Sequence, residues 1–148
     1  MLYSGTAVAL RLGHRTSLDF DLFSSEPLNV DALYRTIPFL VNSTPLQREA
    51  DALTVLVQRR ASVKVSFFGG IGIGCIDPPE LAEDAILQVA SPRDLMGTKL
   101  KVLLQRVEGN YYRDIAALLR SGITLGEALA RRKRFTRDSS RRARHSRR

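Results

Sequence analysis

The chain has 148 residues, enough for one domain with a buried core, and 44% of them are hydrophobic, as in ordinary globular proteins. No apolar run approaches the roughly 18 residues that a membrane-spanning helix needs, so we expect no membrane partner. The single cysteine, Cys75, excludes an internal disulfide and fits a cytoplasmic protein.

The net charge of +8 is concentrated at the C-terminal end. Residues 131–148 contain ten Lys and Arg and one Asp, so the rest of the chain is close to neutral. We expect 1–130 to form the folded domain and 131–148 to be a basic, disordered tail, because the tail has too few apolar residues to bury a face. Two interpretations of the tail stay open: an arm that binds RNA phosphates, or the arginine-rich product of a frame slip in a GC-rich gene.

The first predicted element is a short apolar helix that begins at the small-residue turn Gly5-Thr6 and ends at the turn Gly13-His14-Arg15. A strand carrying Asp19 and Asp21 follows it. Side chains alternate along a strand, so the two acids share one face while Leu18, Phe20 and Leu22 share the other. The strand therefore has one acidic face and one apolar face.

Two carboxylates at this spacing lie roughly 7 Å apart at the backbone and can converge on one cation. Magnesium is commonly held by one or two carboxylates together with substrate phosphates. The helix start offers free N–H groups, and Thr6 offers a hydroxyl, to a phosphate. Each piece alone is more often structural, but their order along 23 residues favours a metal-phosphate site.

The middle of the chain predicts a helix from Val30 to Ile37, capped by Asn29, and then an antiparallel hairpin of strands 53–57 and 62–68. In the second strand Val63, Val65 and Phe67 should face the core, which places Lys64 and Ser66 on the opposite face. The glycine-dense segment 69–74 lacks the spacing of a phosphate loop and is interpreted as a crossing segment. A short strand is expected over 86–89.

Ser91 and Pro92 predict a helix start, and the apolar spacing continues to about Val107 with Lys99 at the edge of its apolar face. A further helix should span 113–120 and end at Gly122. Residues 124–127 have the pattern of a capping box for a last helix.

The motifs resemble two signatures of the AbiEii/AbiGii toxin family in the nucleotidyltransferase superfamily. The first corresponds to Ser4-Gly5-Thr6-Ala7, Gly13-His14-Arg15 and Ser17-Leu18-Asp19-Phe20-Asp21, and the second to Asp94-Leu95, Lys99-Leu100, Arg106 and Tyr111-Tyr112-Arg113-Asp114. Three positions depart from the pattern. Ser4 replaces a glycine, Tyr111 replaces an aspartate, and Ser66 or Lys64 stands where many superfamily members carry a third carboxylate.

The resemblance implies an α+β nucleotidyltransferase-like fold, with a small mixed sheet, flanking helices and C-terminal helices, that extends upstream of Met1 in family members. It implies a metal-dependent nucleotidyltransferase that moves NMP from an NTP to an acceptor, RNA being a candidate, with a cognate antitoxin as protein partner. The expected catalytic residues are Asp19, Asp21, Lys99 and Asp114; the nucleotide-binding residues are Gly5, Thr6, Arg15, Ser17 and Lys99; and Asp19 and Asp21 would bind Mg²⁺.

Other interpretations stay open at this point. Lys99 could be a solvated helix charge, Asp114 could cap a helix, and His14 could be a solvated turn residue rather than a general base. The departures at Ser4, Ser66 and Tyr111 also allow a catalytically inactive relative that binds nucleotide or RNA without turnover.

Overall fold

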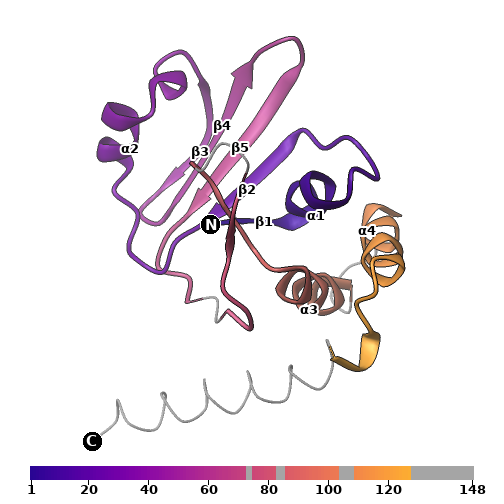
Figure 1. The fold of residues 1–148 in the computed structure, drawn as a ribbon. Helices are drawn as coiled ribbons and strands as arrows, with labels where there is room; N and C mark the ends of the chain where they lie inside the picture. Colours follow the sequence, from indigo (N-terminus) through magenta and orange to yellow (C-terminus); the bar gives the residue numbers. More distant parts are fainter. Residues whose placement is uncertain (73–74, 83–85, 104–108, 128–148) are drawn as a thin grey trace, which may run out of the picture.

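The computed structural model describes residues 1–72, 75–82, 86–103 and 109–127. Their backbone forms a mixed sheet in the order β3-β4-β5-β2-β1-β7-β6 (Figure 1). The strands are β1 Leu2–Tyr3, β2 Asp19–Phe23, β3 Thr44–Glu49, β4 Ala52–Gln58, β5 Ser62–Phe68, β6 Glu80–Leu81 and β7 Gln88–Val89. The helices are α1 Ser4–Leu12, α2 Val30–Thr36, the 3-10 turn η1 Pro38–Leu40, α3 Pro92–Leu103 and α4 Gly109–Arg120.

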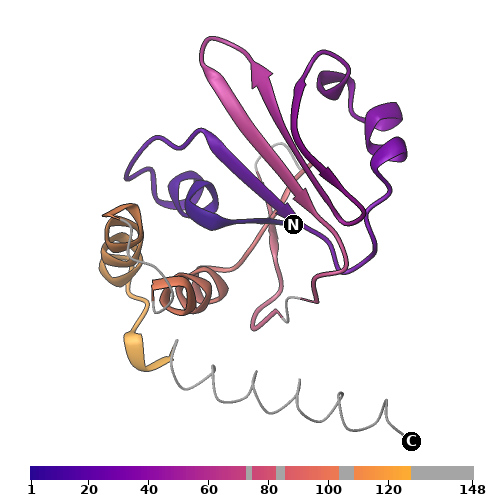
Figure 2. The same cartoon turned by 180° about the vertical axis from the view of Figure 1, so that it is seen from behind.

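The sheet combines three antiparallel groups, β3-β4-β5, β2-β1 and β7-β6, through the parallel pairs β5-β2 and β1-β7. Strand β2 lies between β5, to which it is parallel, and β1, to which it is antiparallel. Helices α1, α3 and α4 contact one another on the β1 side, whereas α2 lies beside β3 and β4, as Figures 1 and 2 show from opposite directions. The mixed α+β fold expected from the sequence is confirmed.

Local signals in the sequence account for most helix ends. Gly13 has φ 60° and closes α1 by donating its N–H to the carbonyl of Ala9. The Asn29 side chain accepts from the N–H of Ala32 at 2.9 Å and starts α2. Ser91 Oγ accepts from the N–H of Asp94 at 3.1 Å and starts α3.

Two further caps hold the C-terminal elements. Gly122, at φ 96°, ends α4, with backbone bonds to Leu119 and from Ile123 to Leu118 that form a Schellman motif. Thr124 and Glu127 cap each other reciprocally, through Thr124 N–H to Glu127 Oε2 at 3.1 Å and Glu127 N–H to Thr124 Oγ1 at 3.2 Å. The predicted capping box is therefore confirmed, while the tail 131–148 lies outside the described residues.

Two apolar clusters meet at β2. One joins β1, α1, α3 and α4 around Leu2, Val8, Met96 and Leu118, and the other joins β4 and β5 to η1 around Leu40, Val55 and Phe67. Phe20 and Leu22 pack against both clusters. Burial of this side of β2 leaves Asp19 and Asp21 on the other side, as the alternation predicts.

Several elements differ from the sequence prediction, either because a strand was not expected or because its ends lie elsewhere. Strand β3 was not expected, because TPLQRE contains a proline and no apolar alternation; it is an edge strand, fully exposed, with a register shift between Pro45 and Gln47. Strand β7 is limited to Gln88–Val89 and pairs with the unexpected β6. Helix α4 begins at Gly109 rather than Arg113, so Asp114 lies inside the helix and does not cap it. The predicted end of the helix near Val107 falls outside the described residues.

Candidate functional site

Helix α1 is tied to the acidic strand through a buried threonine. The Thr6 hydroxyl donates to the backbone carbonyl of Asp19 and lies 2.8 Å from Ser17 Oγ. Only 2% of Thr6 is exposed. These bonds fix the beginning of β2 against the first turn of α1, so the structure brings Thr6, Ser17 and Asp19 together.

The first turn of α1 starts from an unusual backbone conformation. Ser4 has a φ of 74°. Among the described residues it is the one residue other than glycine that has a positive φ. An L side chain in this region costs roughly 1–2 kcal/mol, which glycine avoids. The departure noted at Ser4 therefore falls on a position where glycine would be the less strained residue.

The acidic face of β2 continues onto β5. In the parallel register Asp19 lies opposite Lys64 and Asp21 lies opposite Ser66. Lys64 Nζ is 3.4 Å from Asp19 Oδ1, and both side chains reach solvent. Ser66 is buried, at 3% exposed, and its Oγ is 3.3 Å from Thr54 Oγ1 on β4. The strand that could supply a third carboxylate therefore supplies a lysine and a buried serine.

A second cluster of charged residues is built around Asp114 of α4, which is fully buried. Arg15 binds its carboxylate with Nε at 2.7 Å from Oδ1 and Nη2 at 3.1 Å from Oδ2. Lys99 Nζ of α3 is 2.7 Å from Oδ2, and His14 Nε2 is 2.8 Å from Oδ1. We call these four residues the Asp114 cluster; it joins three segments that are far apart in the sequence.

The charge of Asp114 is strongly favoured in the folded chain. Burial alone would raise the pKa of this carboxyl, but hydrogen bonds from Arg15, Lys99 and His14 outweigh burial and lower the pKa to about 2. The carboxylate of Asp114 faces two basic side chains, those of Arg15 and Lys99, so basic groups outnumber acidic ones in the cluster. It is a local excess of positive charge held in a fixed geometry.

Arg15 connects the Asp114 cluster with the acidic strand. Its pKa is raised chiefly by the hydrogen bond to Asp114, against the effect of burial, and to a lesser extent by the charges of Asp114 and Asp19. Gly5 makes the close approach possible, because a Cβ there would lie 2.0 Å from Arg15 Nη2 and 3.1 Å from Asp114 Oδ2. Gly5, Arg15 and Asp19 therefore belong to one contiguous region.

Lys99 and Tyr111 form a pair that the sequence motif did not reveal. The Lys99 ammonium lies 4.7 Å from the centroid of the Tyr111 ring, which is within the range of a cation–π contact. Lys99 is 5% exposed, so it is not a solvated helix charge. Tyr111 stands where the resemblance expects an aspartate, and the face of its ring lies against the Lys99 ammonium.

His14 is also not a solvated turn residue, since its side chain is mostly buried against Asp114. The contact joins residues 100 positions apart, which no local sequence pattern shows. Its Nδ1 is buried and makes no hydrogen bond within the described part of the chain. Because an ionised carboxylate only accepts hydrogen bonds, Nε2 is the ring nitrogen that donates to Asp114.

The chemistry of the acidic face fits one divalent cation better than two. Asp19 and Asp21 supply two hard oxygen donors on one side of β2, which suits magnesium when phosphates complete the shell. Among the described residues, no group of three or more His, Cys, Asp and Glu side chains is arranged to hold a metal ion. A metal at this face would therefore depend on oxygens from its substrate.

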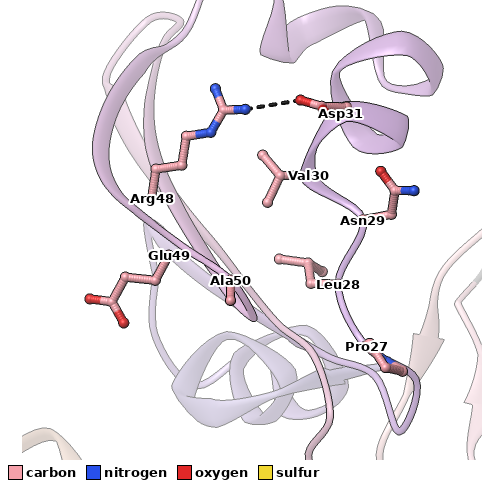
Figure 3. A pocket seen from close by; sticks show the side chains of 8 residues that line it. All are labelled: Pro27, Leu28, Asn29, Val30, Asp31, Arg48, Glu49 and Ala50. Carbon is pink, nitrogen blue, oxygen red and sulfur yellow. Dashed lines mark hydrogen bonds and ion pairs between the residues drawn. The ribbon is translucent and has the colours of Figure 1, made fainter.

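A separate pocket lies away from the acidic face of β2 and from the Asp114 cluster. Figure 3 shows it between β3 and the segment that begins α2, where the Arg48–Asp31 ion pair joins the two sides. Its volume is about 850 Å³. None of the predicted site residues lines it.

No helix within the described residues is long and apolar enough to cross a bilayer.

The chain is similar to known proteins along most of its length. Residues 5–147 match the family described as nucleotidyl transferase AbiEii toxin, type IV toxin–antitoxin system. An uncharacterized protein of Aquifex aeolicus (strain VF5) is 30% identical over 121 residues, which cover 80% of this chain and 57% of that protein. The chain thus spans little more than half the length of this relative, and it belongs to the AbiEii nucleotidyl transferase toxin family.

Proposed function

We propose that this chain, a member of the AbiEii family, is a metal-dependent nucleotidyltransferase that transfers NMP from an NTP to an acceptor. The single observation that carries the proposal is that the first turn of α1 joins the two regions: Thr6 donates to the carbonyl of Asp19, and the adjacent Gly5 lies directly against Arg15 and Asp114. An NTP combines a metal-binding triphosphate with anionic oxygens, and this region offers carboxylates for the metal and cations for the oxygens.

In this proposal Asp19 and Asp21 hold Mg²⁺, which when bound would neutralise charge on the triphosphate and polarise its phosphoryl oxygens. The backbone at Gly5 and Thr6 provides the positive end of α1 for a phosphate. Thr6 and Ser17 act by fixing the start of β2, because the Thr6 hydroxyl contacts both the Ser17 hydroxyl and the backbone carbonyl of Asp19.

Arg15 and Lys99 supply positive charge for the triphosphate, and Asp114 holds both cations in position. An acceptor hydroxyl would attack the α-phosphorus and lose its proton to solvent. The bond between the α-phosphorus and the bridging oxygen would break, so that pyrophosphate leaves and the acceptor carries the NMP. Catalysis would come mainly from positioning and charge neutralisation. RNA is the proposed acceptor class, and the family's description as a toxin of a toxin–antitoxin system supports a cognate antitoxin as partner. A cytoplasmic location is part of the same proposal.

The direct test is transfer of label from α-³²P NTPs to RNA. The double variant Asp19→Asn/Asp21→Asn should lose the labelled product, whereas Asp31→Asn should keep it, since Asp31 lies on α2 in an exposed ion pair with Arg48. Equal labelling by the wild-type chain, the double variant and Asp31→Asn would refute the proposed mechanism.

A second candidate function is nucleotide or RNA binding without turnover. The observation that favours it is the engagement of Lys99, which lies 2.7 Å from Asp114 and over the Tyr111 ring rather than open to solvent. Magnesium-dependent NTP binding that requires Asp19 and Asp21 but yields no labelled product with any RNA supplied would support this alternative.

A further inference from the structure

Lys64 is the residue of the acidic face to which the proposed function assigns no part. It lies on β5 directly opposite Asp19, with Nζ 3.4 Å from Asp19 Oδ1. The Lys64 side chain is 43% exposed and that of Asp19 is 61% exposed. An ion pair this exposed contributes little to folding, so stability does not account for a lysine at this position.

The neighbouring position makes the placement of Lys64 informative. Ser66 is on the same face of β5, opposite Asp21, but it is buried and directed to Thr54. A serine hydroxyl carries no charge to hold a second divalent cation. The strand beside the two acids therefore brings a positive group to the face where an additional carboxylate would have brought a negative one.

The charges of the face follow from this arrangement. The two carboxylates of Asp19 and Asp21 and the ammonium of Lys64 give this face a net charge of about −1. Two-metal sites place cations roughly 4 Å apart and hold them with several shared anionic ligands. At this face the second cation would meet an ammonium beside one of only two carboxylates.

We propose that Lys64 takes the place of a second metal ion, so that the site binds one divalent cation and uses the Lys64 ammonium to neutralise the triphosphate. This inference rests on the proposed function, because it assumes that a metal-bound triphosphate is the ligand. In the structure the ammonium pairs with Asp19. Its flexible four-carbon stem and its exposure allow it to turn to a phosphate oxygen when a cation takes Asp19.

The proposal predicts two binding changes of opposite sign in Lys64→Met. Mn²⁺ alone should bind more tightly, because the variant removes a competitor for Asp19. Tripolyphosphate in the presence of Mg²⁺ should bind more weakly, because the variant removes a cation that neutralises it. Two unit charges about 5 Å apart in a water-like medium change a dissociation constant by roughly fourfold. Because each probe carries more than one charge, both constants should change by at least about fourfold.

The variants isolate the charge from the fold. Lys101→Met is the matched control, since Lys101 is an exposed lysine of α3. Lys64→Arg keeps the charge and should stay within about twofold of the wild-type chain for both probes. Lys64→Gln repeats the neutralisation with a polar side chain should the methionine variant fail to fold. Mn²⁺ binding is followed by electron paramagnetic resonance and tripolyphosphate binding by calorimetry.

The proposal would be overturned if the dissociation constants of Mn²⁺ and tripolyphosphate changed in the same direction in Lys64→Met, or if both matched those of Lys101→Met. It would also be overturned if no variant bound Mn²⁺. Neither probe requires turnover. Opposite shifts in a chain that labels no RNA would uphold the role of Lys64 and refute the catalytic function. Labelling that depends on Asp19 and Asp21, with constants unaltered in Lys64→Met, would refute only the role of Lys64.

Discussion

Replacing Asp114 by Asn removes the one carboxylate of the Asp114 cluster at nearly constant volume. In the folded chain Arg15 and Lys99 would then lose their shared anion while they remain packed near its position. Breaking a buried ion pair in this way costs about 3–5 kcal/mol. We expect Asp114→Asn to lower the free energy of unfolding by about that amount at pH 7.

The pH dependence gives a second, independent value for the contribution of the ionised Asp114 to the free energy of unfolding. Folding lowers the pKa of Asp114 from 3.8 to about 2, a difference worth about 2.5 kcal/mol. Because the folded pKa is the lower one, this stability is present above pH 4 and is lost as the pH falls through 2. At pH 3 about 1 kcal/mol is already lost in the wild-type chain, while the Asn side chain has nothing to titrate.

Urea unfolding followed by circular dichroism at pH 7 and pH 3 measures both effects. The difference between wild type and Asp114→Asn should shrink by about 1 kcal/mol at pH 3. Asp31→Asn is the control, because Asp31 also pairs with an arginine but in an exposed position, and it should cost less than about 1 kcal/mol. A wild-type advantage below 1 kcal/mol at pH 7, or one that does not change with pH, would refute the account of the Asp114 cluster.

Two further substitutions test the first turn of α1. Gly5→Ala should destabilise the chain by about 2 kcal/mol, because the new Cβ would displace Arg15 from its carboxylate; Gly126→Ala, where a Cβ meets no atom within 4 Å among those described, should be neutral or slightly stabilising in chemical unfolding. Ser4→Gly should raise the free energy of unfolding by about 1 kcal/mol by relieving the positive φ, and an unchanged or lowered thermal midpoint would argue against strain at this residue.

Local patterns in the sequence were sufficient for elements that depend on local interactions. The caps at Asn29, Ser91 and Gly122 and the alternation around Asp19 and Asp21 describe contacts within a few residues, and the structure reproduces them. Strand β3 escaped prediction because an exposed edge strand needs no apolar face. Its pairing is decided by β4, not by its own composition.

The candidate site was predictable in its parts and not in its assembly. The motifs named Arg15, Lys99 and Asp114, but the ion pairs that join them span up to 99 positions in the sequence. The burial of His14 and the contact of Lys99 with Tyr111 depend on how α3 and α4 pack against α1. The alignment of Lys64 with Asp19 depends on the parallel register of β2 and β5, which hydrophobic alternation alone does not determine.

The most direct test of the central claim is calorimetric titration with a non-hydrolysable NTP, with and without Mg²⁺. The account predicts one binding event per chain that requires Mg²⁺, is retained in Asp31→Asn and is lost in Asp19→Asn/Asp21→Asn. Binding that is independent of Mg²⁺, or of equal strength in the double variant, would show that the acidic face of β2 is not the nucleotide site.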